Sequence, residues 1–177
     1  MFKNRHPDLE TPDSDLRSVI LTLAEELGGK PALIDSPTER TLSYTQLSQP
    51  IQHFAAGLNQ RGFKKDDVFA TLVPNVPSSA EVFLGVAAGG GVNTPFNSLY
   101  SSRDLVHQLT DADTRFLFTI PEFLDRALPA ARKAVTAFSD LLINAGNASS
   151  VTFDPKTDLS ATHYYSGTTV ISEGVLA

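Results

Sequence analysis

The sequence predicts an α/β protein in which a mainly parallel sheet carries helices on both faces, with a small β-hairpin beside it. Two observations support this class. Short apolar runs of strand character alternate with helical segments from residue 68 onward, and parallel strands that are buried on both faces show this pattern. Capping residues and glycine stops bound the helical segments. At 177 residues the chain suits one domain with a core of its own.

The first elements are an arm, a helix and a hairpin. Residues 1–14 are polar and contain prolines, which favours an extended arm. Apolar residues then recur at helical spacing up to Leu27, and Gly28 and Gly29 provide the stop. Residues 31–35 and 40–43 flank a turn-forming tetrapeptide, so we expect a β-hairpin.

The next helix is predicted from a capping box. Ser43 and Gln46 have the required spacing, apolar residues line one face as far as Leu58, and Gly62 is placed to end the helix. Pro50 conflicts with this pattern because an interior proline removes a backbone hydrogen bond. We therefore expect a kink at Pro50 or a later helix start.

The central part of the chain is predicted to have the element order β-α-β-α-β. Strands are expected at residues 68–73, 92–95 and 115–119. The first intervening helix is predicted to start at a capping box, Ser78 to Glu81, and to stop at the glycines 89–91. The second is predicted over residues 101–111. Together with the preceding helices these elements form an α/β unit over residues 15–143.

The remainder is predicted to hold a further helix, a loop and two strands. Pro121 suits the first turn of a helix, and Pro129 is expected to break or bend it. A strand is expected at residues 141–143. Residues 144–160 are rich in Ser, Asn and Asp and predict a loop, which leads into a strand and a polar loop over residues 161–177.

Composition excludes several classes of function. The net charge of −6, without a cluster of Lys or Arg, argues against a nucleic-acid surface. The chain has no cysteine, and its four histidines lack the spacing of metal ligands, so no metal site is expected. No apolar run reaches the length of a membrane span, and the N-terminus lacks the apolar core of a signal peptide, which favours the cytoplasm.

The polar loop near the end of the chain is the candidate for phosphate binding. Gly167 allows the backbone to approach an anion, and Ser166, Thr168 and Thr169 supply hydroxyl donors beside the backbone N–H groups. An ordinary Ser/Thr/Gly turn is the alternative. A Walker loop is excluded because no Gly-Lys-Ser/Thr follows.

Two other patterns are weaker. The three glycines 89–91 follow a predicted helix, whereas the glycines of a dinucleotide-binding motif follow a strand, so a helix stop is the better interpretation. Asp111 and Asp113 are close in sequence, but a turn between a helix and a strand is a common place for solvated acids.

The polar loop resembles the phosphate-binding loop of the adenylate-forming enzymes, Ser/Thr-Ser-Gly-Thr-Thr-Gly-x-Pro-Lys-Gly-Val. Six positions match: Ser166, Gly167, Thr168, Thr169, Gly174 and Val175. Upstream segments, among them Pro31 to Asp35, Thr41 to Leu47, Val73-Pro74-Asn75 and Asn97 to Tyr100, look like the ordered N-terminal landmarks of coumarate- and fatty-acyl-CoA ligases. The resemblance implies the N-terminal AMP-binding subdomain of that fold, truncated here.

The resemblance also implies a chemistry. Family members activate a carboxylic acid with ATP and Mg²⁺ to an acyl-adenylate and then transfer the acyl group to CoA. The acyl pocket, the residues for adenine and Mg²⁺, and the catalytic lysine lie downstream in the family, so no catalytic residue is assigned to this chain. The acyl or aryl substrate stays open.

Four positions depart from the loop pattern. Tyr165 stands for Ser/Thr, Val170 for glycine, Ser172 for proline and Glu173 for lysine. A carboxylate in place of an ammonium repels phosphate, and Val170 has a Cβ where glycine would allow positive φ. We therefore expect none of the implied cofactors, ATP, Mg²⁺ and CoA, to bind this chain tightly.

Three hypotheses about function follow. The first is an N-terminal piece of an acyl- or aryl-CoA ligase that is inactive alone. The second is a non-catalytic relative that acts as an interaction or regulatory module, and the third is a luciferase-like monooxygenase, which shares the adenylation step. Under the first, uncovered apolar surface would favour a homo-oligomer.

Overall fold

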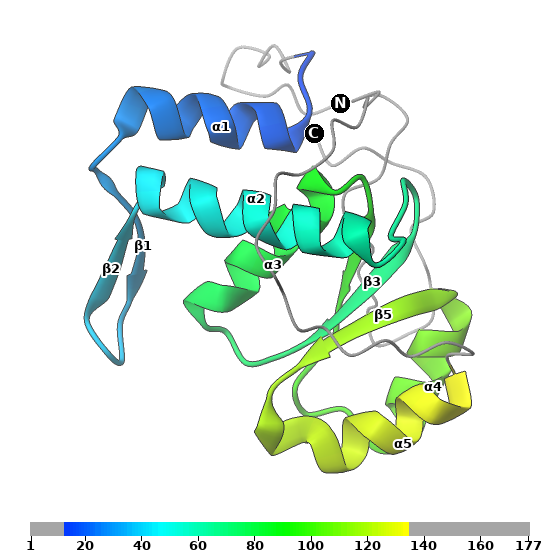
Figure 1. Ribbon diagram of the computed structural model, residues 1–177. Coiled ribbons are helices and arrows are strands. Elements are labelled where there is room, and N and C mark those ends of the chain that lie inside the picture. The colour runs from blue at the N-terminus through cyan, green and yellow to red at the C-terminus, as the bar shows by residue number, and fades with distance from the viewer. Residues whose placement is uncertain (1–12, 135–177) are drawn as a thin grey trace, which may run out of the picture.

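A computed structural model describes residues 13–134. The expected arm over residues 1–12, the strand at 141–143, the loop at 144–160 and the strand and polar loop at 161–177 lie outside the described residues. Within the described part the α/β class is confirmed, with a parallel three-stranded sheet, a separate antiparallel hairpin and helices on both faces of the sheet (Figure 1).

The N-terminal elements form as the local signals predict. Helix α1 (Leu16–Leu27) begins where Asp15 accepts a hydrogen bond of 2.9 Å from the Ser18 backbone N–H, and it ends at Gly28, whose φ is +49°. Strands β1 (Pro31–Asp35) and β2 (Arg40–Ser43) pair antiparallel, so the predicted hairpin is confirmed. The hairpin side chains Ala32 and Leu33 pack against α2 together with Ile20 of α1.

Helix α2 (Tyr44–Gln60) starts at the predicted capping box. Ser43 accepts from the Gln46 N–H, and the Gln46 side chain accepts from the Ser43 N–H. The helix is continuous through Pro50, so the alternative of a later start is wrong. Its apolar face is buried on both sides of the proline, at Leu47, Ile51 and Phe54, and this packing outweighs the one lost backbone bond.

The α/β repeat follows in the expected order. It consists of β3 (Val68–Leu72), α3 (Pro77–Ala88), β4 (Val92–Pro95), α4 (Ser102–Asp111) and β5 (Thr114–Thr119). The α4 helix is capped reciprocally by Ser101 and Asp104, and the Ser101 hydroxyl, which donates to the Asp104 carboxylate at 2.6 Å, lowers the pKa of Asp104. Asp111, the last residue of α4, and Asp113, in the turn before β5, are both exposed.

The predicted capping box of α3 is wrong. The helix starts one residue before Ser78, with Pro77 in its first turn, and its N-cap is Val76, which has no side chain able to accept a hydrogen bond. Proline favours the first helical position because its φ is already helical and its missing N–H has no partner there in any case. Because of this preference α3 starts at Pro77, so that Ser78 and Ser79 lie inside the helix and do not cap it.

The last described helix also passes through a proline. A 3₁₀ turn (Pro121–Phe123), labelled η1, leads into α5 (Leu124–Ala134), which continues through Pro129. The expected break is therefore absent. Ala127, Ala130 and Ala131 on the same helix are almost fully buried, so the packed side of α5 holds the helix together across the proline.

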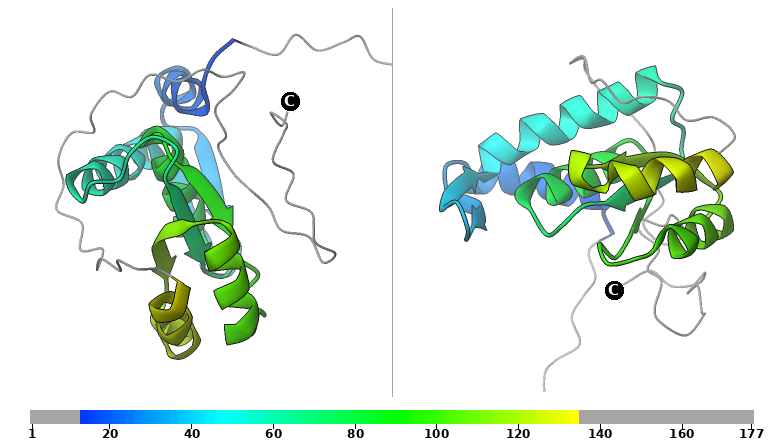
Figure 2. Two further views of the ribbon diagram at one scale, coloured as in Figure 1. Left: turned by 90° about the vertical axis from the view of Figure 1, so that its right-hand side faces the viewer. Right: turned by 90° about the horizontal axis from the view of Figure 1, so that it is seen from below.

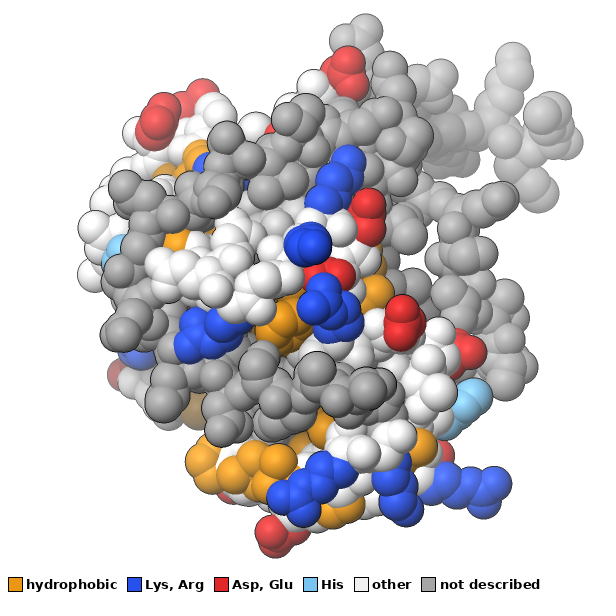
Figure 3. All heavy atoms as spheres, turned by 45° about the vertical axis from the view of Figure 1, so that its right-hand side comes forward, with side chains coloured by type: hydrophobic (Ala, Val, Ile, Leu, Met, Phe, Trp, Pro, Cys, Tyr) orange, Lys and Arg blue, Asp and Glu red, His pale blue; other side chains and the backbone are white. Residues whose placement is uncertain are grey.

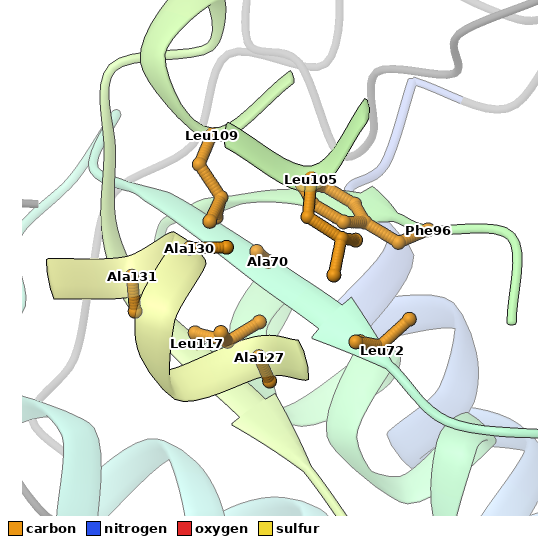
Figure 4. Packing of buried hydrophobic residues seen from close by; sticks show 9 residues of the cluster. All are labelled: Ala70, Leu72, Phe96, Leu105, Leu109, Leu117, Ala127, Ala130 and Ala131. Carbon is orange, nitrogen blue, oxygen red and sulfur yellow. The ribbon is translucent and has the colours of Figure 1, made fainter. Parts of the chain in front are cut away.

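The sheet has the order β4-β3-β5, and both pairings with β3 are parallel. Helices α2 and α3 cover one face and α4 and α5 the other, as the views in Figures 1 and 2 show. Alternation along the strands separates two cores. Phe69 and Phe116 point to the α2–α3 side, whereas Ala70, Leu72 and Leu117 point to the α4–α5 side (Figure 4).

An aromatic cluster fills the α2–α3 side. The Phe69 ring stacks on Phe116 with centroids 6.2 Å apart, and Phe54 and Phe63 meet Phe69 edge to face at 5.7 and 6.1 Å. The helices and the α3–β4 turn come close to this cluster. A Cβ added at Gly85 would lie 2.7 Å from the Phe54 ring, and one added at Gly91 would lie 2.1 Å from the Phe63 ring.

We predict that Gly91→Ala destabilises the fold by about 1–3 kcal/mol, the usual cost of overpacking a core. The added methyl group would also lie 2.8 Å from the Asp67 carbonyl oxygen, and a backbone atom cannot move aside as a ring can. Urea denaturation of the two proteins measures the difference. Gly29→Ala is the matched control, since no atom lies within 4 Å of its added Cβ. Equal losses in the two variants would contradict the prediction.

Candidate functional site

The residues predicted to bind phosphate lie outside the described residues. These are Ser166, Gly167, Thr168, Thr169 and Gly174, with the four departures Tyr165, Val170, Ser172 and Glu173. Their part in ATP binding stays a prediction. The described residues instead show the framework at which such a loop would act, the carboxyl edge of the parallel sheet.

The carboxyl ends of β3, β4 and β5 lie at one edge because the strands are parallel. Ligands of open α/β sheets bind outside this edge. The strand ends are tied to one another here: the Phe96 N–H donates to the Thr71 carbonyl at 2.8 Å, and the Thr119 hydroxyl donates to the Leu72 carbonyl at 2.8 Å. These hydrogen bonds fix the positions of the segments that follow β3, β4 and β5.

A cavity of about 490 Å³ opens at this edge, between the strand ends and α3. Phe83 and Leu84 of α3 form one wall, and Val73 and Phe96, which follow β3 and β4, form another. Thr71, Asn75, Ser79 and Asn93 are the polar lining residues, and none of the described lining residues is charged. The cavity therefore suits an uncharged group more than an ion.

Two buried polar pairs lie next to each other on β4, one on each face of the sheet. Asn93 is 1% exposed, and its side-chain nitrogen donates to the Thr71 hydroxyl at 2.8 Å on the α3 side. Thr94 accepts from Gln108 of α4 at 3.2 Å on the opposite side. These bonds join β4 to β3 on one face and to α4 on the other, so the edge strand is fixed in its register.

The segment that follows β4 is held by Arg126 of α5. The guanidinium donates to the carbonyl oxygens of Ser98 and Tyr100, and it lies 4.2 Å from the Phe123 ring centroid. Asn97 closes the turn by accepting from the Leu99 N–H at 2.9 Å. A planar cation with several donors can bind two carbonyls at once, so one side chain fixes this loop on the carboxyl side of the sheet.

The opposite edge of the sheet carries an ion pair. Arg115 at the start of β5 and Asp67 just before β3 are 2.6 Å apart, and the hydrogen bond to Asp67 raises the pKa of Arg115. Asp67 also accepts from the Lys64 N–H. Half of the Arg115 side chain is exposed, so the pair serves to close the ends of two strands and contributes little to stability.

Within residues 13–134 no group of three His, Asp or Glu could hold a metal ion. No helix in that range is long and apolar enough to cross a membrane. The described residues thus supply a scaffold, an uncharged cavity and fixed loops at the carboxyl edge. None of the described residues that line the cavity has an acidic or basic side chain.

The family model of the AMP-binding enzymes matches residues 22–174. The chain belongs to this family. The match covers most of the described residues and extends over the predicted phosphate loop, so the family assigned from the ordered sequence landmarks is confirmed.

Curated relatives include CoA ligases of several organisms. 4-Coumarate–CoA ligase 3 of Oryza sativa subsp. japonica is 29% identical over 190 residues, which cover 99% of this chain and 34% of that protein. Phenylacetyl-CoA ligase of Aspergillus niger is 33% identical over 132 residues, 74% of this chain and 24% of that protein. The chain therefore spans about a third of the length of the relatives it matches.

Solved structures share the fold. A long-chain-fatty-acid-CoA ligase from Archaeoglobus fulgidus superposes with a TM-score of 0.84 at 20% identity, covering 95% of this chain and 37% of that chain. A benzoate CoA ligase from Burkholderia xenovorans superposes with a TM-score of 0.72, covering 84% of this chain and 32% of that one. The expected N-terminal subdomain of adenylate-forming ligases is confirmed as the fold.

Sequence reasoning missed the cavity and the buried polar pairs. One signal was present: Asn93 and Thr94 follow Val92 inside a short strand where apolar residues are expected. A polar side chain inside a buried strand needs a partner, and the partners are Thr71 and Gln108. Their separations of 22 and 14 residues place them beyond any local pattern.

We predict that Glu173→Lys strengthens the binding of Mg²⁺-ATP by at least about tenfold, because the family resemblance assigns this position to the phosphate loop, and an ammonium group attracts phosphate where a carboxylate repels it. Isothermal titration calorimetry at 0.15 M salt measures the affinity. Glu122→Lys, an exposed position before α5, makes the same change in net charge and is the control. An equal gain in both variants would show that net charge, not the predicted loop, is responsible.

Proposed function

We propose that this chain is the N-terminal part of an ATP-dependent acyl- or aryl-CoA ligase, which activates a carboxylic acid through an acyl-adenylate. The observation that carries the proposal is the family match over residues 22–174 together with CoA ligases as relatives along almost the whole chain. The described residues provide the sheet and its carboxyl edge. The predicted loop at Ser166 to Gly174 would contact the ATP phosphates.

We propose further that these 177 residues do not complete the reaction alone. The chain covers 34% of the rice ligase and 37% of the fatty-acid ligase from Archaeoglobus fulgidus. Among the described residues no group of three His, Asp or Glu could hold a metal ion. In family members the downstream part of the chain binds the adenine, the acyl group and CoA, so the complete reaction would need such residues as well.

A second candidate is a non-catalytic interaction or regulatory module. Val170 and Glu173 favour it, since both changes weaken a phosphate loop. The genomic sequence separates the two candidates. An open reading frame that continues past Ala177 into ligase motifs supports the ligase part, and a stop codon at that point supports the module.

We predict that the 177-residue chain releases no pyrophosphate above background when it is given ATP, Mg²⁺, CoA and a panel of aliphatic and aromatic acids. The reason is that the family resemblance places the acyl pocket, the residues for adenine and Mg²⁺ and the catalytic lysine downstream of these residues, and such groups jointly supply the many orders of magnitude of an enzymatic rate. A coupled pyrophosphate assay measures turnover. A full-length 4-coumarate–CoA ligase is the positive control, and clear turnover by this chain would contradict the proposal.

We also predict that the chain self-associates. Among the described residues Leu99 is 85% exposed and Ile34 is 68% exposed. Figure 3 shows hydrophobic side chains next to Lys and Arg at the end of the molecule formed by α4 and α5. Uncovered apolar surface of this kind favours association.

Light scattering over a range of protein concentrations tests the prediction, and the mean mass should rise with concentration. Leu99→Gln should reduce that rise, because the Arg126 contacts hold the loop while the leucine side chain stays outside. Thr22→Gln on the exposed side of α1 is the control. A strict monomer at high concentration would count against self-association.

A further inference from the structure

The cavity between α3 and the carboxyl ends of β3 and β4 has the features of a small-molecule site. Its volume of about 490 Å³ falls in the range of ligand pockets, which are about 300–1,000 Å³. Its walls are mainly apolar, with two phenylalanines, a leucine and a valine. Such pockets combine apolar walls with a few polar groups that fix the orientation of the ligand.

Asn93 provides the polar group. It is 1% exposed and lines the cavity, and its register opposite Phe69 places it on the α3 face of the sheet. The amide nitrogen donates to the Thr71 hydroxyl at 2.8 Å. The amide oxygen has no hydrogen-bond partner among the described residues and is not one of their fully buried unpaired atoms, so it is accessible to a group in the cavity that Asn93 lines.

The chemistry of this amide selects a hydroxyl group as its partner. The Thr71 hydroxyl both donates and accepts, so either orientation of the Asn93 amide satisfies Thr71 and leaves the other amide atom for the cavity. A ligand hydroxyl also donates and accepts, and it can pair with that atom in both cases. A hydroxyl therefore fits the site without any rearrangement.

Charge and size limit the rest of the ligand. None of the described lining residues carries a charge, so an ionised ligand would lose its hydration without gaining a counter-ion. A cavity of about 150 Å³ holds benzene, and the larger volume here leaves room for a second ring. The phenyl rings of Phe83 and Phe96 offer aromatic surface to such a group.

We propose that this cavity binds an uncharged aromatic molecule of one or two rings that carries one hydroxyl group, with the hydroxyl bonded to Asn93 and the rings packed between α3 and the ends of β3 and β4. The binding needs no nucleotide. It is therefore independent of the proposed ligase function, and loss of one does not imply loss of the other.

The test uses the 177-residue chain without ATP and three matched probes. 2-Naphthol has the two rings and the hydroxyl, naphthalene lacks the hydroxyl, and 2-naphthoate is ionised at pH 7. Fluorescence titration should show saturable binding of 2-naphthol, with naphthalene and 2-naphthoate each at least about tenfold weaker because the former loses the bond to Asn93 and the latter must bury a charge.

Two variants locate the binding. Ala80→Phe places a ring in the cavity from α3 and should abolish the titration, and Asn93→Leu should reduce the affinity for 2-naphthol to that for naphthalene. Thr110→Phe, an exposed position of α4 away from the cavity, is the control and should bind as the parent chain does. Circular dichroism checks that each variant is folded, and if Asn93→Leu is not, Ala80→Phe together with the naphthalene comparison decides.

Saturable binding of 2-naphthol that Ala80→Phe removes, with naphthalene weaker, supports the proposal. The proposal is overturned if 2-naphthol does not bind, if it binds Ala80→Phe as tightly as the parent chain, or if all three probes bind equally. Pyrophosphate release is measured separately, so failure of the ligase function and failure of naphthol binding are distinguishable.

Discussion

The central strand β3 must be buried on both faces, and the rest of the structure follows from that requirement. Phe69 faces α2 and α3, while Ala70 and Leu72 face α4 and α5. A parallel strand reaches its neighbours only through crossover connections, so each helix that joins two strands also covers a face. On one face this burial is achieved by the aromatic cluster around Phe69, and on the other by an interface with α5 that is rich in alanine.

Polar groups are placed inside this framework at its carboxyl end. Asn93 with Thr71 lies on one face and Thr94 with Gln108 on the other, and Thr119 closes onto the backbone of β3. The bonds of Asn93 and Thr94 are buried and that of Thr119 is partly buried, and specific bonds of this kind favour one register over others. Arg126 likewise fixes the loop after β4, because its guanidinium donates to the Tyr100 carbonyl. A fixed sheet edge is what a family that binds nucleotides beyond its strands would require, and the chain has such an edge, although its predicted phosphate loop departs from the family pattern at four positions.

Family, fold and the number and order of the described elements could be predicted from the sequence, and the reasons are local. Ser43 with Gln46, Asp15 with Ser18 and the glycine stops act within a turn of chain. A kink or a later start was expected at Pro50, and a break or bend at Pro129. Both helices are continuous, because Ile51 and Phe54 of α2 and Ala127 and Ala130 of α5 are buried on either side of or next to these prolines. At α3 a proline in the first turn took precedence over two serines.

By itself the sequence determined the type and order of the main helices and strands, that the strands are buried on both faces, and which family the chain resembles, because these depend on residues a few positions apart. Only the tertiary structure decided the order β4-β3-β5, the pairing of Asn93 with Thr71, the hold of Arg126 on the loop after β4, and the cavity beside α3. These features depend on residues that are far apart in the sequence. Asn93 and Thr71, which join β4 to β3, are 22 positions apart, and Thr119 and Leu72, which join β5 to β3, are 47 positions apart. Such contacts form when whole elements pack, and no short stretch of sequence encodes their geometry.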